Sequence, residues 1–205
     1  MSNQELTALA EKYVAPTYGR YPVALVRGEG CRVWDADGKE YLDFVSGIAV
    51  CNLGHCHPGV TEAIRKQAGE IVHVSNLYHI EPQIELARRL CENSFADKAF
   101  FCNSGTEACE AAIKLARKYS YKKHGEGRNE ILTFDMSFHG RTMASLSATA
   151  QEKFHKGFSP LLPGFRHIPF NDVESAAAAV SEKTCAIMVE PIQGEGGIRI
   201  PSEGY

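Results

Sequence analysis

The residues Ser104, Gly105 and Thr106 stand between an apolar run at 99–102 and an alanine-rich segment at 106–121. A strand that turns through small polar residues into a helix leaves unpaired N–H groups in the first helical turn, and the helix dipole favours an anion there. Gly105 allows close backbone approach, and the two hydroxyls add donors. The spacing indicates a phosphate-binding turn, although no Walker-type Gly-Lys-Ser/Thr follows. Helix capping by Ser104 or Thr106 explains the same residues equally well.

A second group of side chains that could bind a ligand or take part in catalysis follows the predicted strand 130–134. It comprises Phe138, His139 and Arg141. Loops after parallel strands face the ligand crevice of an α/β sheet. Phe138 would stack there on a planar ring, and Arg141 would clamp a carboxylate with two hydrogen bonds. His139 would act as a base or as a polar packing residue. Taken alone, the stretch also fits a core phenylalanine beside a solvated arginine.

Two carboxylates, Glu190 and Glu195, lie with three glycines after the predicted buried strand 184–189. A carboxylate is costly to bury without partners, so Glu190 indicates a polar site at the end of this strand. A carboxylate pair is also used in glycoside hydrolysis, but a separation of five residues on one turn is a weak signal for that chemistry.

The segment 51–57 holds four soft metal ligands, Cys51, His55, Cys56 and His57. Structural zinc sites usually combine one short ligand loop with a second, distant pair. The sequence contains no Cys-x-x-Cys pair that would complete such a site. We therefore expect no metal, and predict a turn with hydrogen-bonded histidines.

The elements that would position these groups change character near residue 98. The predicted helices cover 4–14, 60–72, 106–121, 173–180 and a segment that begins at Pro82. The predicted strands cover 23–27, 31–35, 40–44, 99–102, 130–134, 165–169 and 184–189. The strand–helix alternation after residue 98 predicts an α/β fold with a mostly parallel sheet. The earlier strands, with a hairpin turn at Asp37-Gly38, predict a small antiparallel N-terminal region.

The composition is that of an ordinary globular protein, with 205 residues, 44% hydrophobic and 23% charged residues and a net charge of −3. The absence of a like-charge block and of an apolar run near ~18–20 residues argues against nucleic-acid and membrane partners. The first ten residues contain no signal-peptide core, and seven scattered cysteines suit a reducing compartment. We expect a cytoplasmic protein.

The three motifs at 104–106, 137–142 and 190–197, in this order and each after a strand, resemble those of the class III (ornithine-type) aminotransferases. The resemblance covers the whole chain and includes the runs at 22–28 and 33–44. It implies the fold-type I architecture, an α/β fold with an incomplete, mostly parallel sheet, and pyridoxal 5′-phosphate (PLP) as cofactor. It further implies that residues 1–60 belong to a small domain, and that residues 61–205 form the N-terminal part of the large PLP-binding domain.

The resemblance implies a role for each cofactor-binding candidate. Ser104, Gly105 and Thr106 would bind the phosphate of PLP, in agreement with the phosphate-binding turn. Phe138 would stack on the pyridine ring, and Glu190 would lie beside the cofactor.

For the substrates, the resemblance implies that Arg141 binds the α-carboxylate of the amino donor and that Glu195 switches between the donor and 2-oxoglutarate. In family members, the Schiff-base lysine and the aspartate that pairs with the pyridinium nitrogen follow the Glu190 motif. None of the eleven lysines of this sequence matches that lysine. We therefore expect no catalytic residue in this chain, and expect it to be the N-terminal part of a longer subunit, inactive by itself.

Within the class, residues 46–50 and 190–197 most resemble the members that act on N-acetylornithine. The implied reaction moves the amino group of N-acetylornithine, or of ornithine, to 2-oxoglutarate, as in arginine biosynthesis, within a homodimer. Succinylornithine and 4-aminobutyrate stay open as donors, and so does a non-catalytic function in binding a phosphate-bearing ligand.

Overall fold

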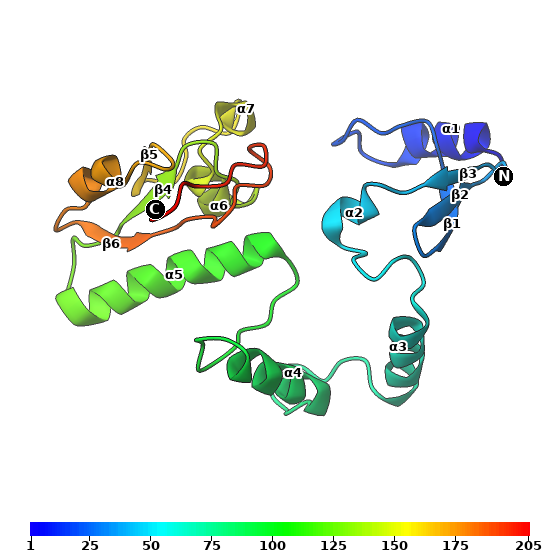
Figure 1. Cartoon of the computed structure of the whole chain (residues 1–205), viewed down its shortest axis with the longest axis horizontal. Helices are drawn as coiled ribbons and strands as arrows, with labels where there is room; N and C mark the ends of the chain where they lie inside the picture. The colour runs from blue at the N-terminus through cyan, green and yellow to red at the C-terminus, as the bar shows by residue number, and fades with distance from the viewer. The chain divides into compact units, whose positions relative to one another are not determined.

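The chain divides into two compact units in the computed structural model, which describes residues 1–205 (Figure 1). The N-terminal unit covers Met1–Glu81, and the C-terminal unit covers Pro82–Tyr205. No helix of either unit combines the length and the apolar character needed to cross a membrane. The small-domain and large-domain ranges expected from the sequence, 1–60 and 61–205, remain predictions.

The N-terminal unit contains the predicted small antiparallel sheet. Its strands pair in the order β1-β2-β3, with bounds β1 (Leu25–Glu29), β2 (Arg32–Asp35) and β3 (Glu40–Leu42). Its helices are α1 (Asn3–Tyr13), α2 (Ser46–Ala49) and α3 (Pro58–Glu70). Helix α1 begins where the sequence favours it, because Ser2 and Glu5 form a capping box.

The turn between β2 and β3 is organised by the buried carboxylate of Asp35. This carboxylate accepts hydrogen bonds from the Tyr41 hydroxyl at 2.7 Å and from the backbone N–H groups of Lys39 and Asp37 at 2.8 and 3.0 Å. The bond from Tyr41 is the main cause that lowers the pKa of Asp35 to about 2. Gly38 follows with a φ of 87°, a conformation that favours glycine. The predicted hairpin is confirmed.

The histidine-containing segment 51–57 forms the predicted hydrogen-bonded turn. Nε2 of His55 lies 2.6 Å from Oδ2 of Asp43, and the backbone of His55 pairs with Gly30. The hydrogen bond with His55 is the main cause that lowers the pKa of Asp43. Nowhere in residues 1–205 do three His, Cys, Asp or Glu side chains gather so that they could hold a metal ion.

The C-terminal unit contains a parallel three-stranded sheet, as the strand–helix alternation predicts. The strands lie in the order β5-β4-β6, with bounds β4 (Glu130–Phe134), β5 (Phe165–Ile168) and β6 (Thr184–Ile187). The helices are α4 (Glu81–Glu92), which starts at the unit boundary, α5 (Gly105–His124), α6 (Met143–Ala148), α7 (Glu152–His155) and α8 (Val173–Ala179).

The middle strand β4 is buried on both faces of this sheet. Ile131 packs in a cluster with residues of α5 and α6, whereas Leu132 and Phe134 pack in a second cluster with β5 and α8. Successive strand residues point to opposite faces, so these two clusters cover the two sides. This burial explains why β4 reads as an almost continuous apolar run instead of an alternating one.

The structure differs from the sequence-based prediction in two respects. The predicted strand at 99–102 is wrong, because no segment of residues 1–205 pairs with it and an extended run without a partner forms no ladder. Helices α2, α6 and α7 were not predicted. They span four, six and four residues, too few for a helical apolar period to show in the sequence. Lys153 lies in α7.

The loops that carry the candidate residues follow β4 and β6, whose carboxyl ends share one edge of the sheet because the strands are parallel. Gln193 joins the two loops. Its side chain is fully buried, and its Nε2 donates to the carbonyl oxygen of Asp135 at 2.8 Å. Its backbone pairs with Arg199 through hydrogen bonds of 3.1 and 3.0 Å. The 190–197 loop is therefore held against the end of β4.

We expect Gln193→Ala to lower the free energy of unfolding by about 1–3 kcal/mol, because the Asp135 carbonyl loses its donor and a buried side chain is removed. Gln83, exposed on α4, is the matched control, and Gln83→Ala should change stability by less than about 0.5 kcal/mol. Urea unfolding of both variants measures the difference. Equal losses would contradict an anchoring role for Gln193.

Candidate functional site

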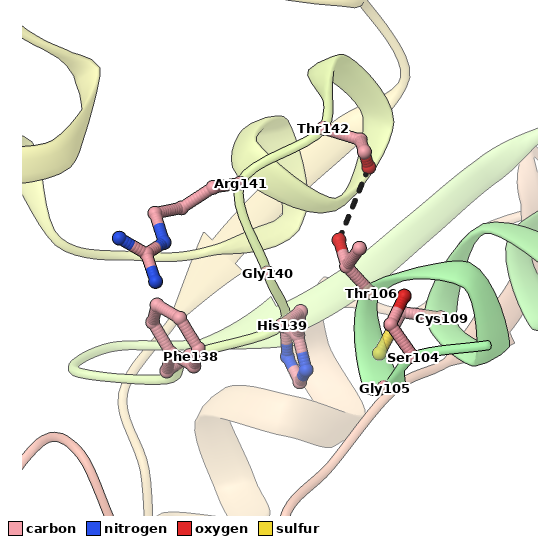
Figure 2. A pocket seen from close by; sticks show the side chains of 9 residues that line it. All are labelled: Ser104, Gly105, Thr106, Cys109, Phe138, His139, Gly140, Arg141 and Thr142. Carbon is pink, nitrogen blue, oxygen red and sulfur yellow. Dashed lines mark hydrogen bonds between the residues drawn. The ribbon is translucent and has the colours of Figure 1, made fainter. Parts of the chain in front are cut away.

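A pocket of about 600 Å³ lies where the start of α5 meets the loop between β4 and α6 (Figure 2). Two of the three predicted motifs, 104–106 and 137–142, contribute its walls, although more than thirty positions separate them in the sequence. The lining residues are Ser104, Gly105, Thr106, Cys109, Phe138, His139, Gly140, Arg141 and Thr142. The structure thus brings together the anion-binding, ring-stacking and carboxylate-binding candidates.

The first wall is the N-terminus of the 20-residue helix α5. Ser104 is the N-cap, and its hydroxyl accepts the N–H of Glu107 at 3.2 Å, so the capping interpretation is confirmed for Ser104. The N–H groups of Gly105 and Thr106 make no hydrogen bond within the chain. Apart from its chain neighbours and the nearby backbone of its own helix, no atom lies within 4 Å of where a Cβ on Gly105 would be. The positive end of a long helix thus carries two donors without a partner in the chain.

The second wall carries Phe138, whose backbone is held from the third motif. Its N–H donates to Oε1 of Glu190 at 2.8 Å, while Oε2 of Glu190 accepts the N–H of Gly194 at 3.3 Å. The Phe138 ring packs edge-on against Phe154, with centroids 5.5 Å apart. Glu190 does not line the pocket itself. Its carboxylate, predicted to need partners at the strand end, finds them in two backbone N–H groups.

His139 forms the floor between these walls (Figure 2). It is only 6% exposed, and its backbone N–H donates to the Thr149 hydroxyl at 2.8 Å. Burial lowers the pKa of its imidazole, so the ring is neutral at pH 7. Its Nε2 is buried without a hydrogen-bond partner. A buried polar atom left unpaired is costly, and such an atom beside a pocket indicates a ligand or a further polar group there.

The two predicted substrate-binding residues are not brought into one pocket. Arg141 lines the pocket and is exposed, and Figure 2 shows its guanidinium on the side where the Phe138 ring lies. Glu195 lies outside it, with Oε1 at 3.2 Å from Nζ of Lys153. Both members of this pair are about half-exposed. A substrate role for Glu195 stays a prediction.

Gly140 lets the loop cross closely over the start of α5. Its φ is 125°, and an added Cβ would collide with the side chain of Thr106 and come within 2.7 Å of Oγ of Ser145. Only glycine meets both conditions, a positive φ and the lack of a Cβ. The contact between the two walls of the pocket therefore depends on this residue.

Sequence reasoning missed five residues at the site, one of which is Gly140. Cys109 and Thr142 line the pocket, and Glu110 and Ser145 lie behind Thr106. Glu110 follows Thr106 by four positions, which places both on one face of a helix. Thr142 and Ser145 have the spacing of a capping box, the available signal for α6. Burial raises the pKa of the Cys109 thiol, which argues against a thiolate nucleophile.

Comparison with known proteins decides the family. The family model described as aminotransferase class-III matches residues 13–205. The chain belongs to the class-III aminotransferases. The resemblance predicted from the order of the three motifs is confirmed.

Among curated relatives, the chain is similar to two acetylornithine aminotransferases. The enzyme of Caldanaerobacter subterraneus subsp. tengcongensis is 60% identical over 195 residues, which are 95% of this chain and 50% of that protein. The enzyme of Methanocaldococcus jannaschii is 53% identical over 205 residues, which are 100% of this chain and 52% of that protein. The chain thus spans about half the length of these relatives.

Solved structures have the same fold. The ornithine aminotransferase of Toxoplasma gondii ME49 matches with a TM-score of 0.94 and 33% identity over 100% of this chain and 49% of that one. The acetylornithine aminotransferase of Elizabethkingia anophelis matches with a TM-score of 0.81 and 33% identity, over 100% and 48%. A second structure of the Toxoplasma gondii enzyme, with a TM-score of 0.91 and 33% identity over 98% and 48%, has PLP at partial occupancy in its active site. The predicted fold-type I aminotransferase architecture is confirmed.

We expect Gly140→Ala to destabilise the C-terminal unit by about 2 kcal/mol more than Gly125→Ala. Both glycines have positive φ, so both substitutions carry backbone strain of about 1–3 kcal/mol. Only the Cβ at position 140 meets other side chains, whereas the space around Gly125 is open. Urea unfolding of the two variants isolates the steric cost. A larger loss for Gly125→Ala would refute the close approach at Gly140.

Proposed function

We propose that this chain is the N-terminal part of a PLP-dependent aminotransferase subunit that moves the amino group of N-acetylornithine to 2-oxoglutarate. The observation that carries the proposal is the pair of unbonded N–H groups on Gly105 and Thr106, which face a pocket that also holds Phe138 and Arg141. Identities of 50–60% to acetylornithine aminotransferases support the choice of donor.

The residues of the pocket fit PLP. The N-terminus of α5 offers the donors and the dipole that a phosphate group requires. The aromatic face of Phe138 suits a pyridine ring, and the unpaired Nε2 of buried His139 suits a polar partner inside the pocket. When bound, PLP would supply an electron sink for the negative charge that develops on the carbon bearing the transferred amino group.

Each residue of the chain then has a task of binding or orientation. Ser104, Gly105 and Thr106 would hold the phosphate, and Phe138 would stack on the pyridine ring. Glu190 keeps Phe138 in place through the 2.8 Å bond to its backbone. Arg141 would bind the donor's α-carboxylate by two hydrogen bonds and thereby orient the carbon that bears the transferred amino group.

Glu195 is proposed as the residue that distinguishes the amino donor from 2-oxoglutarate. In this structure only Lys153 holds its carboxylate, at 3.2 Å and with both side chains about half-exposed. A surface ion pair of this kind contributes little free energy. Glu195 can therefore exchange Lys153 for another cation or for the substrate at small cost.

The complete subunit is proposed to be a cytoplasmic homodimer in arginine biosynthesis, with residues 1–60 in its small domain and 61–205 in its large domain. The coverage of about half of each relative supports a longer subunit. The Schiff-base lysine is proposed to lie in the remaining part, because none of the eleven lysines here matches it. Residues 1–205 would then bind PLP but not turn over substrate.

The complete polypeptide encoded by the gene should bind PLP and transfer the amino group of N-acetylornithine faster than that of ornithine, succinylornithine or 4-aminobutyrate. Glutamate formation from 2-oxoglutarate measures this. Residues 1–205 alone should form no glutamate. Reversible PLP binding by the complete polypeptide without glutamate formation would favour a non-catalytic ligand-binding protein. Turnover by residues 1–205 would refute the proposal that the Schiff-base lysine lies outside this part of the subunit.

Replacement of Arg141 should separate substrate binding from cofactor binding. A charged, two-point hydrogen bond is worth about 1.5–3 kcal/mol, so Arg141→Lys should raise KM for N-acetylornithine by about 10–100-fold. The Kd of PLP should stay unchanged. Arg166→Lys, at an exposed position of β5, is the control and should leave both values unchanged. Weaker PLP binding with an unchanged KM would contradict the assignment of Arg141.

A further inference from the structure

Behind the pocket wall, three hydroxyl groups and one carboxylate form a connected cluster. Oγ1 of Thr106 lies 2.7 Å from Oγ of Ser145 and 3.2 Å from Oγ1 of Thr142, and the last two oxygens are 2.8 Å apart. Oγ1 of Thr142 also lies 2.5 Å from Oε1 of Glu110. We call Thr106, Thr142, Ser145 and Glu110 the hydroxyl cluster. Only Thr106 and Thr142 line the pocket.

Glu110 sets the direction of the hydrogen bonds in this cluster. Its Oε1 accepts the backbone N–H groups of Ala144 and Ser145, each at 3.1 Å, at the start of α6. A carboxylate only accepts, so the Thr142 hydroxyl donates its single proton to Glu110. The Thr142 oxygen is then left as an acceptor for its two hydroxyl neighbours.

Two proton arrangements remain for Thr106 and Ser145. In the first, Thr106 donates to Ser145, whose own proton goes to the Thr142 hydroxyl at 2.8 Å or to the Thr142 carbonyl at 3.1 Å. In the second, Ser145 donates to Thr106, and the Thr106 proton goes to the Thr142 hydroxyl oxygen at 3.2 Å or toward the pocket. An anion in the pocket stabilises the second arrangement, because it accepts that proton.

The surroundings keep Ser145 close to Thr106. Ser145 is fully buried, and its oxygen also accepts the N–H of Thr142 at 3.1 Å. Gly140 passes over both hydroxyls with no Cβ to separate them. The Ser145 side chain therefore has the Thr106 hydroxyl as its nearest polar neighbour in the cluster, at 2.7 Å.

We propose that Ser145 is a positioning residue for the phosphate of the cofactor: its hydroxyl donates to Thr106, so that Thr106 donates its own proton to a phosphate oxygen. Glu110 supports this direction because it accepts the Thr142 proton, so that the Thr142 hydroxyl cannot donate to Thr106 or Ser145. The inference rests on the proposed function, since it assigns a polar support to the phosphate site of that function.

Loss of this support should weaken PLP binding and leave pyridoxal binding unaffected. One neutral hydrogen bond is worth about 1 kcal/mol, so Ser145→Ala should raise the Kd of PLP by about 5-fold. Pyridoxal lacks the phosphate, and its Kd should not change. Equilibrium dialysis with the complete polypeptide measures both constants. A purely structural role would raise both constants alike and would overturn the proposal.

Ser147→Ala is the matched control, because Ser147 is also buried on α6 and its hydroxyl donates to the Met143 carbonyl, outside the hydroxyl cluster. It should leave the Kd of PLP unchanged. In a Thr106→Ala background, Ser145→Ala should cause no further loss, since its effect passes through Thr106. An additive loss in the double variant would overturn the proposal.

The outcomes separate this inference from the function on which it rests. If the unaltered polypeptide binds no PLP, the proposed function fails and this inference fails with it. If the unaltered polypeptide and Ser145→Ala bind PLP equally, only the role of Ser145 fails. If Ser145→Ala does not fold, Ser145→Cys keeps a similar size with a weak donor and should also weaken PLP binding, whereas unchanged binding would refute the role.

Discussion

The start of α5 is the constraint on which the rest of the site depends. A 20-residue helix exposes N–H groups in its first turn, and here Ser104 satisfies one of them while those of Gly105 and Thr106 stay unbonded. Backbone donors cannot move to find a partner, so the anion must come to them. The strand order β5-β4-β6 then determines what surrounds that point, because the loops after two parallel strands meet at one edge of the sheet.

Polar bonds connect these loops to one another. Glu190 accepts N–H groups from Phe138 and Gly194, and Gln193 donates to the carbonyl of Asp135. Buried polar groups cost free energy unless they are paired, and the Glu190–Phe138 and Gln193–Asp135 pairs each join segments distant in sequence. The same bonds that satisfy buried groups therefore keep the Phe138 ring at the pocket wall. Three buried side-chain atoms stay unpaired, Oγ1 of Thr133, Nε2 of His139 and the Tyr205 hydroxyl, and of these residues only His139 lines the pocket.

The hydroxyl cluster gives the turn at 104–106 a support that backbone geometry alone does not provide. A hydroxyl rotates freely, so a threonine at a helix start can donate inward or outward. Glu110 is held by two N–H groups of α6 and accepts the proton of the Thr142 hydroxyl. The direction of the Thr142 bond is thereby set, and it influences the directions in which Thr106 and Ser145 donate. Helices α5 and α6 thus share one network at the point where an anion would bind. Membership of the class-III aminotransferases gives this arrangement its chemical setting.

The sequence by itself determined the order of the motifs and their local chemistry. Some features depend only on residues near in sequence. These are the small-residue turn at 104–106, the β-prone runs and the glycine at the hairpin. Only the tertiary structure decided which distant groups meet. Glu190, a candidate to lie beside the cofactor, accepts the backbone N–H of Phe138, which only the folded chain brings to it. Ser145 signalled no more than a helix cap, because its contact with Thr106, 39 positions away, arises only on folding. The run at 99–102 shows the same limit, because a strand requires a partner and no local preference supplies one.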